Sequence, residues 1–99
     1  GTEKVESLKV RNVRTDEEKT IAVDGVFIAV GILPNTEKFK GLVALDESGY
    51  IVAGEDGVTS TPGIFAAGDI RTKNLRQVVT AVADGANAVA SVQRYLLEK

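Results

Sequence analysis

The sequence predicts an α/β fold, in which a β-hairpin and short strands are followed by one long C-terminal helix. Three features of the apolar pattern predict it. Apolar residues roughly alternate with polar ones over residues 5–23, continuous apolar runs fill residues 26–30 and 64–67, and apolar residues recur every three or four positions from Val78 to Leu96. Alternation is typical of a half-exposed strand, and a continuous apolar run is typical of a strand buried on both faces. A spacing of three to four residues is typical of a helix.

The composition of the chain excludes several classes of function. Its 99 residues suffice for one domain or a piece of one. A net charge of −2 gives no electrostatic basis for binding nucleic acid or an anionic membrane surface, and no apolar run is long enough to span a bilayer. The chain contains no Cys, His or Met. It therefore cannot form a disulfide or supply a thiolate nucleophile or a histidine base. Because the chain opens on Gly1 rather than Met, we expect a processed, cut or engineered segment.

The N-terminal elements are predicted from the turn residues between the apolar runs. Thr15–Glu18 is a polar tip between the two strands of the hairpin, and Asp24 and Gly25 make a second turn. The apolar run that follows is predicted to be a strand buried on both faces. It ends at Gly31, and Pro34 makes the next stretch a connector.

The C-terminal elements are two further strands and the helix. Tyr50–Val52 is predicted to be a short strand, and residues 64–67 a second buried strand. The helix is expected to begin at Asn74 or Leu75, where Asn74 and Gln77 fit a capping-box-like arrangement.

The predicted helix carries apolar and small residues over well over half of its circumference. A helix that is apolar on most sides is buried on most sides. Gly85 lies near its middle, at a cost of about 0.5–1 kcal/mol relative to alanine, so we expect another segment to pack closely there. The predicted strands are too few to cover such a helix, and we therefore expect more protein around this chain.

The strongest local signal for chemistry is Gly68-Asp69 at the end of a predicted strand, with the helix start a few residues later. A carboxylate at a strand end can accept two hydrogen bonds from neighbouring hydroxyls. A helix N-terminus offers unpaired N–H groups and a partial positive charge. Together they predict a site for a polyol beside an electron-rich carbonyl or an anion. The alternative is that Gly68 and Asp69 only turn the chain.

The other polar candidates are weaker. Arg71, Lys73 and Arg76 could bind phosphate, and the alternative is that they are solvated. Tyr95 is predicted to pack rather than to act as an acid. The acidic run Asp16–Glu18 has no second carboxylate cluster at metal-ligand spacing, so we interpret it as a hairpin tip. The sequence predicts no catalytic residue and no metal site in this chain.

Four segments in this order resemble the C-terminal third of the low-molecular-weight bacterial thioredoxin reductases. They are VFIAVGILPNT at 26–36, TSTPGIFAAGD at 59–69, LRQV at 75–78 and the helix that follows. The pattern T-x-x-P-G-I-F-A-A-G-D is the second flavin motif of the pyridine nucleotide-disulphide oxidoreductases, and R-Q-V narrows the resemblance to the class II thioredoxin reductase branch. The resemblance implies a fragment of a two-domain, three-layer FAD/NAD(P)-binding fold.

The resemblance also implies the role of each segment. Residues 1–33 would be the C-terminal hairpin and last strand of an NADPH-binding domain, and residues 34–99 the C-terminal segment of an FAD-binding domain. Asp69 would hydrogen-bond the ribityl chain of FAD, and Arg76 would lie beside the isoalloxazine ring. The full set of implied cofactor-binding residues is Gly68, Asp69, Ile70, Arg76, Gln77 and Val78, with the backbone N–H groups of the last two facing the flavin pyrimidine edge.

The implied function is electron transfer from NADPH through FAD and a dithiol to thioredoxin. The dithiol, the NADPH phosphate loop and the first FAD glycine loop of the family have no counterpart in these 99 residues. We therefore expect the chain to supply FAD ribityl and isoalloxazine contacts without being competent alone. The resemblance further implies a cytoplasmic protein and thioredoxin as partner. The open apolar face of the predicted helix leads us to expect a homodimer.

Two alternatives remain open from the sequence. One is a fragment of a related flavoprotein, either ferredoxin–NADP reductase-like or the flavoprotein component of a peroxide-reducing system. The other is a non-enzymatic half-domain that self-associates as a dimer or a domain-swapped assembly, because an uncovered apolar helix face is an association site.

Overall fold

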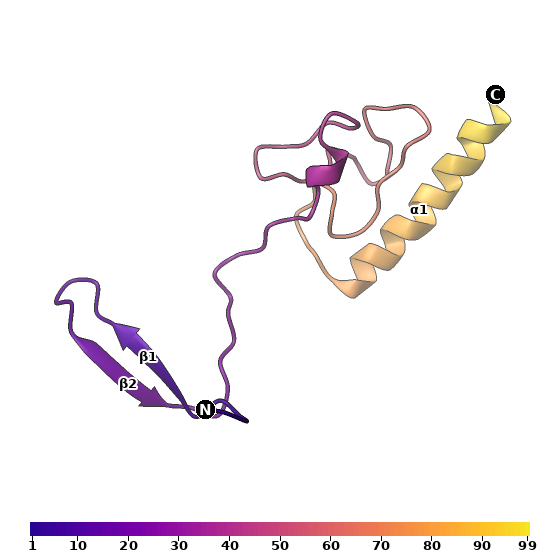
Figure 1. Ribbon diagram of the computed structural model, residues 1–99. Coiled ribbons are helices and arrows are strands. Elements are labelled where there is room, and N and C mark those ends of the chain that lie inside the picture. The colour runs from indigo at the N-terminus through magenta and orange to yellow at the C-terminus, as the bar shows by residue number, and fades with distance from the viewer. The chain divides into compact units, whose positions relative to one another are not determined.

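The computed structural model describes residues 1–99, which form two compact units, Gly1–Ile32 and Leu33–Lys99. The predicted fold class is confirmed, since an N-terminal hairpin precedes one long C-terminal helix (Figure 1). The elements in chain order are β1 (Ser7–Arg11), β2 (Glu18–Ala22), the 3₁₀ helix η1 (Glu37–Phe39) and α1 (Val78–Leu97).

The first unit is built around the predicted hairpin. Strands β1 and β2 pair antiparallel, with Leu8 opposite Ile21. At the tip, the side chain of Asn12 accepts a hydrogen bond from the Arg14 N–H at 2.9 Å. Asp16 adopts φ 63°, a left-handed conformation that aspartate tolerates better than most residues. Nearly all of the hairpin is exposed, so backbone pairing and cross-strand contacts hold it together.

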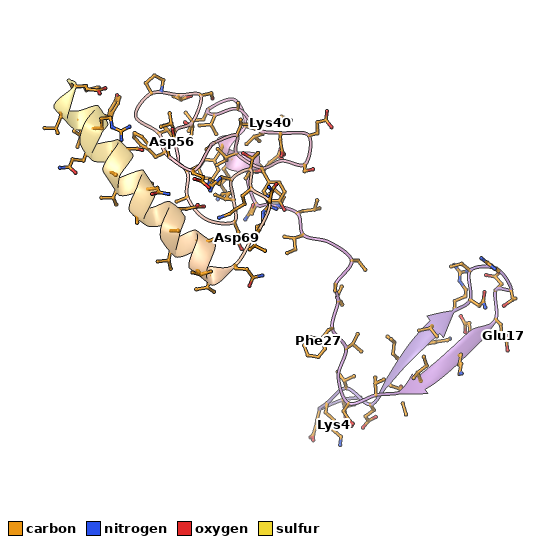
Figure 2. All side chains as sticks on the ribbon, turned by 180° about the vertical axis from the view of Figure 1, so that it is seen from behind. Lys4, Glu17, Phe27, Lys40, Asp56 and Asp69 are labelled. Atoms are coloured by element: carbon orange, nitrogen blue, oxygen red, sulfur yellow. The ribbon has the colours of Figure 1, made fainter.

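The strand predicted over residues 26–30 does not form, and that prediction is wrong for this structure. Phe27 is 100% exposed and Val30 is 94% exposed. Figure 2 shows the Phe27 side chain on an extended stretch of chain. A strand buried on both faces requires neighbours in the sheet and covering layers on each side. The first unit offers only a two-stranded hairpin, whose strands pair with each other.

The second unit packs irregular loops along one side of α1 (Figure 1). Its small core is formed by Val43, Ile51, Ala53 and Ala66. The strands predicted at 50–52 and 64–67 are reduced to isolated bridge pairs, in which Ile51 pairs with Leu45 and Arg71, and Phe65 with Val58. Those two predictions were too long, because Ile51 has a single-residue partner on each side and Phe65 has one single-residue partner in all.

Helix α1 begins three to four residues later than predicted. Its N-cap is Gln77, and the Thr80 hydroxyl accepts the Gln77 N–H at 3.0 Å. The predicted arrangement of Asn74 with Gln77 is therefore wrong. The cause lies upstream, because Arg71 pairs with Ile51 and Thr72 N–H donates to the Ile51 carbonyl at 2.9 Å, which keeps this stretch out of the helix.

One face of α1 packs on the loops and the rest is open. Asp84 and Ser91 are buried on the packed face. Tyr95 lies edge-on to Phe65 with ring centroids 5.9 Å apart, which confirms its predicted packing role. Apolar side chains elsewhere on the helix remain exposed, so burial on most sides does not occur here. Neither helix combines the length and the hydrophobicity that crossing a bilayer requires.

Two glycines of the second unit have opposite surroundings. Gly57 has φ +71°, and a Cβ there would lie 2.8 Å from the Ala66 carbonyl oxygen. Nothing lies within 4 Å of a Cβ built on Gly85. The expected close packing against Gly85 is therefore absent from this structure.

These surroundings predict opposite effects of substitution by alanine. Gly57→Ala should lower the free energy of unfolding by about 1–3 kcal/mol, because it combines a positive φ with a backbone clash. Gly85→Ala should raise it by about 0.5–1 kcal/mol, because alanine favours the helix and meets no neighbour. Urea unfolding followed by circular dichroism measures both. A destabilised Gly85→Ala chain would show that another segment does approach the helix.

Candidate functional site

Most of the predicted cofactor residues lie around one groove at the start of α1. Asp69, Arg76, Gln77 and Val78 line a hollow of about 580 Å³, together with the side chains of Ala81 and Val82. Figure 2 shows Asp69 beside the first turn of the helix. Gly68 and Ile70 precede and follow Asp69 in the chain but are not part of the lining. The sequence did not predict the two apolar wall residues, which the helical spacing from Val78 could have indicated.

The backbone around Asp69 is fixed from both sides. Gly68 turns the chain at φ +85°, and its N–H donates to an Asp84 carboxylate oxygen at 2.9 Å. On the other side, the Ile70 carbonyl accepts the Ile51 N–H at 2.9 Å, which ties the loop to the core. The Asp69 residue itself is exposed. Its carboxylate therefore stands at the groove as a hydrogen-bond acceptor on a fixed turn.

Arg76 contributes a positive charge that no carboxylate partner neutralises. Its Nε donates to the Asp69 carbonyl at 3.0 Å, and its Nη2 donates to the Arg71 carbonyl at 3.2 Å. The guanidinium carbon lies 3.7 Å from the centroid of the Tyr50 ring, in a cation–π contact. Two neutral carbonyls and an aromatic face orient the guanidinium, so its charge remains available to a bound group.

Two residues at the helix start, Gln77 and Val78, line the same groove. The first intrahelical hydrogen bond runs from the Ala81 N–H to the Gln77 carbonyl at 3.0 Å. The Val78 N–H precedes it and has no intrahelical partner. The Gln77 N–H is already bonded to the Thr80 hydroxyl. Of the two amides expected to face a ligand, only that of Val78 is free, and the helix dipole adds to its positive character.

A buried charged cluster close to Asp69 in the chain was not predicted from the sequence. Asp84 accepts hydrogen bonds from Arg71 Nε at 2.8 Å, Arg71 Nη2 at 2.6 Å and Lys73 Nζ at 2.7 Å. The side chains of all three residues are only 6% exposed. Arg71 and Lys73 are thus neither solvated nor free for phosphate. The sequence did contain a signal for this cluster, because Asp84 is an acidic residue among the small residues of the predicted helix.

The cluster shifts the protonation equilibria of its members. The hydrogen bonds from Arg71, and then those from Lys73 and the Gly68 N–H, hold the pKa of Asp84 well below its ordinary range despite its burial. The hydrogen bond to Asp84 raises the pKa of Arg71 in turn. Asp84 and Arg71 therefore both remain charged in the folded chain at neutral pH.

This pairing predicts a loss of stability in acid. The pKa of Asp84 is lower in the folded chain than in the unfolded chain, where an aspartate has a pKa of about 3.9. Its contribution is complete above about pH 4 and is lost as the pH falls further, because the unfolded chain binds the proton first. Urea unfolding at about pH 3 and about pH 6 measures the difference.

A variant without the cluster provides the comparison. Replacing all three residues (Arg71→Met, Lys73→Met and Asp84→Asn) leaves no buried charge unpaired, and should reduce this pH dependence. Asp24→Asn removes an exposed carboxylate from the other unit and is the matched control. An undiminished pH dependence in the triple variant would show that other carboxylates cause it.

A second hollow of about 750 Å³ lies along another part of the loop–helix boundary. Arg71, Lys73 and Asp84 contribute to its lining. The Arg71 guanidinium and the Lys73 ammonium are both held by the Asp84 carboxylate, with side chains only 6% exposed, so they are less accessible to a ligand than Arg76 is. The groove at Asp69 is therefore the better candidate, since its carboxylate, guanidinium and amide are available.

Comparison with protein families identifies the class to which this fold and groove belong. Residues 1–85 match the family described as pyridine nucleotide-disulphide oxidoreductase. Since the match covers most of the chain, the chain belongs to the pyridine nucleotide-disulphide oxidoreductase family. This is the class of flavoprotein-type oxidoreductases that the second flavin motif indicated.

Within this class the chain is similar to thioredoxin reductases over almost its whole length. It is 50% identical over 95 residues to the thioredoxin reductase of Listeria innocua. The aligned region covers 96% of this chain and 30% of that protein. The crystal structure of thioredoxin reductase from Streptococcus pyogenes matches with a TM-score of 0.78 and 45% identity, covering 97% of this chain and 31% of that chain. The resemblance predicted from the motifs is confirmed.

A relative with another name is also similar. The chain is 42% identical over 95 residues to a component of the alkyl hydroperoxide reductase of Pseudomonas putida. The aligned region covers 96% of this chain and 18% of that protein. The chain therefore spans less than a third of the length of each of these relatives. Its sequence and fold correspond to one part of a thioredoxin reductase.

Proposed function

We propose that this chain supplies the flavin-contacting part of a thioredoxin reductase, which passes electrons from NADPH through FAD and a dithiol to thioredoxin. One observation supports this most strongly. An exposed carboxylate, an unneutralised guanidinium and a free helix amide line the same groove, at Asp69, Arg76 and Val78. A flavin with a ribityl chain presents hydroxyls, a ring and electron-rich carbonyls, so this set of groups fits it.

Each group has a defined part in holding FAD. The Asp69 carboxylate accepts hydrogen bonds from ribityl hydroxyls, and Gly68 and Ile70 keep its backbone in place. The Val78 N–H faces the electron-rich edge of the ring, where the positive end of the helix dipole is favourable. Arg76 lies beside the ring, and Ala81 with its neighbour Val82 forms an apolar wall. FAD, when bound, supplies the two-electron redox chemistry.

The domain assignment belongs to the same proposal. Residues 1–33 are the end of an NADPH-binding domain, residues 34–99 are the end of an FAD-binding domain, and Gly31–Thr36 crosses between them. Most of the NADPH site and the redox dithiol are then contributed by residues outside this chain, which contains no Cys. The proposed partner is thioredoxin, and the proposed location is the cytoplasm.

A chimaera tests the proposal directly. The matching part of the Streptococcus pyogenes thioredoxin reductase is replaced by these 99 residues, and the unaltered enzyme is the control. The purified chimaera should carry FAD and reduce thioredoxin with NADPH. A folded but colourless chimaera would overturn the proposal. The 99-residue chain alone should bind FAD weakly or undetectably, because few contacts must offset the entropy lost on association.

The similarity to the alkyl hydroperoxide reductase component supports a second candidate, the flavoprotein of a peroxide-reducing system. Both candidates share the flavin contacts and differ in the protein that receives the electrons. The chain covers 30% of the thioredoxin reductase relative but 18% of the peroxide-reductase relative. The intact mass of the polypeptide that contains this segment in its source cells therefore separates them.

The proposed homodimer gives a prediction for the isolated chain. Val78, Val89 and Leu96 are exposed on α1 by 82%, 69% and 64%. An open apolar face of this kind favours association, so the chain should elute as a dimer or larger species in size-exclusion chromatography with light scattering. Val89→Glu should shift it toward monomer, whereas Gln93→Glu, on the same helix, should not. A wild-type monomer at high concentration would contradict the prediction.

A further inference from the structure

Asp84 is a buried carboxylate that the proposed flavin contacts do not use. It is 5% exposed, and four donors surround it: the Gly68 N–H, two nitrogens of Arg71 and the Lys73 ammonium. Taking a carboxylate out of water is costly, and two cations offset that cost here. Such an arrangement fixes the positions of all its partners.

The partners of Asp84 lie on both sides of Asp69 in the chain. Gly68 immediately precedes Asp69, and Arg71 follows two residues after it. The Arg71 carbonyl accepts a hydrogen bond from Arg76 Nη2 at 3.2 Å. Asp84 is therefore linked, through one intermediate residue each, to the carboxylate and the guanidinium of the groove.

We propose that Asp84 is a positioning residue, which holds the Gly68-Asp69 turn against α1 so that the Asp69 carboxylate stays at the helix start. This inference rests on the proposed function of the groove in binding flavin. Gly68 has φ +85° and no side chain. Its hydrogen bond to α1 is therefore the one that its backbone N–H donates to Asp84. Without an acceptor for that N–H, the turn would keep the bond from Arg76 Nε to the Asp69 carbonyl but would lose its direct bond to α1, so its distance from the amide of Val78 would no longer be fixed.

The alternative is that Asp84 only stabilises the fold through its ion pairs, and two triple variants separate these roles. Both carry Arg71→Met and Lys73→Met, so neither leaves a buried cation unpaired. One adds Asp84→Asn, whose amide oxygen can still accept the Gly68 N–H. The other adds Asp84→Leu, which has similar volume and no acceptor. Replacing buried ion pairs by uncharged groups is often neutral or stabilising, and circular dichroism verifies that both variants fold.

The first readout is hydrogen exchange of the Gly68 amide, measured by NMR on the 99-residue chain without FAD. Exchange should be slow in the wild type and in the Asp84→Asn triple variant. It should be about tenfold faster or more in the Asp84→Leu triple variant, the ratio expected for losing one buried hydrogen bond. Equal exchange rates in the two triple variants would overturn the inference.

The second readout is the dissociation constant for FAD in the Streptococcus pyogenes chimaera. The Asp84→Asn triple variant should bind within about threefold of the wild type, and the Asp84→Leu triple variant about tenfold more weakly or worse. Equal affinities in two folded variants would make Asp84 a purely structural residue. A wild-type chimaera without FAD would instead overturn the proposed function, so the two failures are distinguishable.

Discussion

Asp69→Ala is expected to weaken FAD binding by the chimaera by about 3–6 kcal/mol. The substitution removes two hydrogen bonds to a charged acceptor, each of about 1.5–3 kcal/mol. Because the Asp69 side chain is exposed and its backbone is fixed by Gly68 and Ile70, the fold should be unaffected. Fluorescence titration of FAD into the apoprotein measures the loss, which corresponds to a factor of about 10² to 10⁴ in the dissociation constant.

A matched substitution controls for the loss of negative charge. Glu47 is also an exposed carboxylate of the second unit but does not line the groove. Glu47→Ala should therefore retain wild-type affinity. If Asp69→Ala retains FAD as well as Glu47→Ala does, the groove is not the ribityl site.

Asp84→Asn alone is expected to destabilise Leu33–Lys99 by about 3–5 kcal/mol, the usual cost of breaking a buried ion pair from one side. The amide cannot neutralise Arg71 and Lys73, whose side chains are buried next to it. A unit with a core as small as this one has little stability to lose. Urea unfolding of the chain at neutral pH measures the effect.

The control for this second prediction lies on the same helix face. Ser91 is buried as Asp84 is, and it carries no charge. Ser91→Ala should change the free energy of unfolding by about 1 kcal/mol or less. A similarly small effect for Asp84→Asn would mean that water reaches Arg71 and Lys73 in solution.

Local patterns predicted the elements whose partners are close in sequence. The hairpin formed because alternation and a polar tip bring β1 and β2 together within a few residues. Helix α1 formed because its hydrogen bonds are internal, although pairing at Arg71 delayed its start. The runs at 26–30 and 64–67 have the composition of buried strands, but a strand also needs partners, which a pattern in one segment cannot supply.

The site shows the same division between local and long-range information. The motif around Asp69 and the R-Q-V step predicted four residues that line one groove. The pairing of Asp84 with Gly68 was missed because it joins residues 16 positions apart: the sequence shows an acidic residue among small ones in the helix but does not indicate its partner. The occupied amide of Gln77 was missed because it depends on the position of the N-cap.

The bare extended stretch from Val26 to Val30 has a consequence for handling the chain at high concentration. Five consecutive residues of mostly high β propensity carry no charge and no proline, and their backbone edges are open. Segments of this kind add onto identical segments of other molecules and grow into fibrils. Gly25 and Gly31 limit the length of such a strand, and Asp24 places a charge next to it. These residues slow the stacking of strands. They leave the apolar centre of the segment at Phe27 exposed.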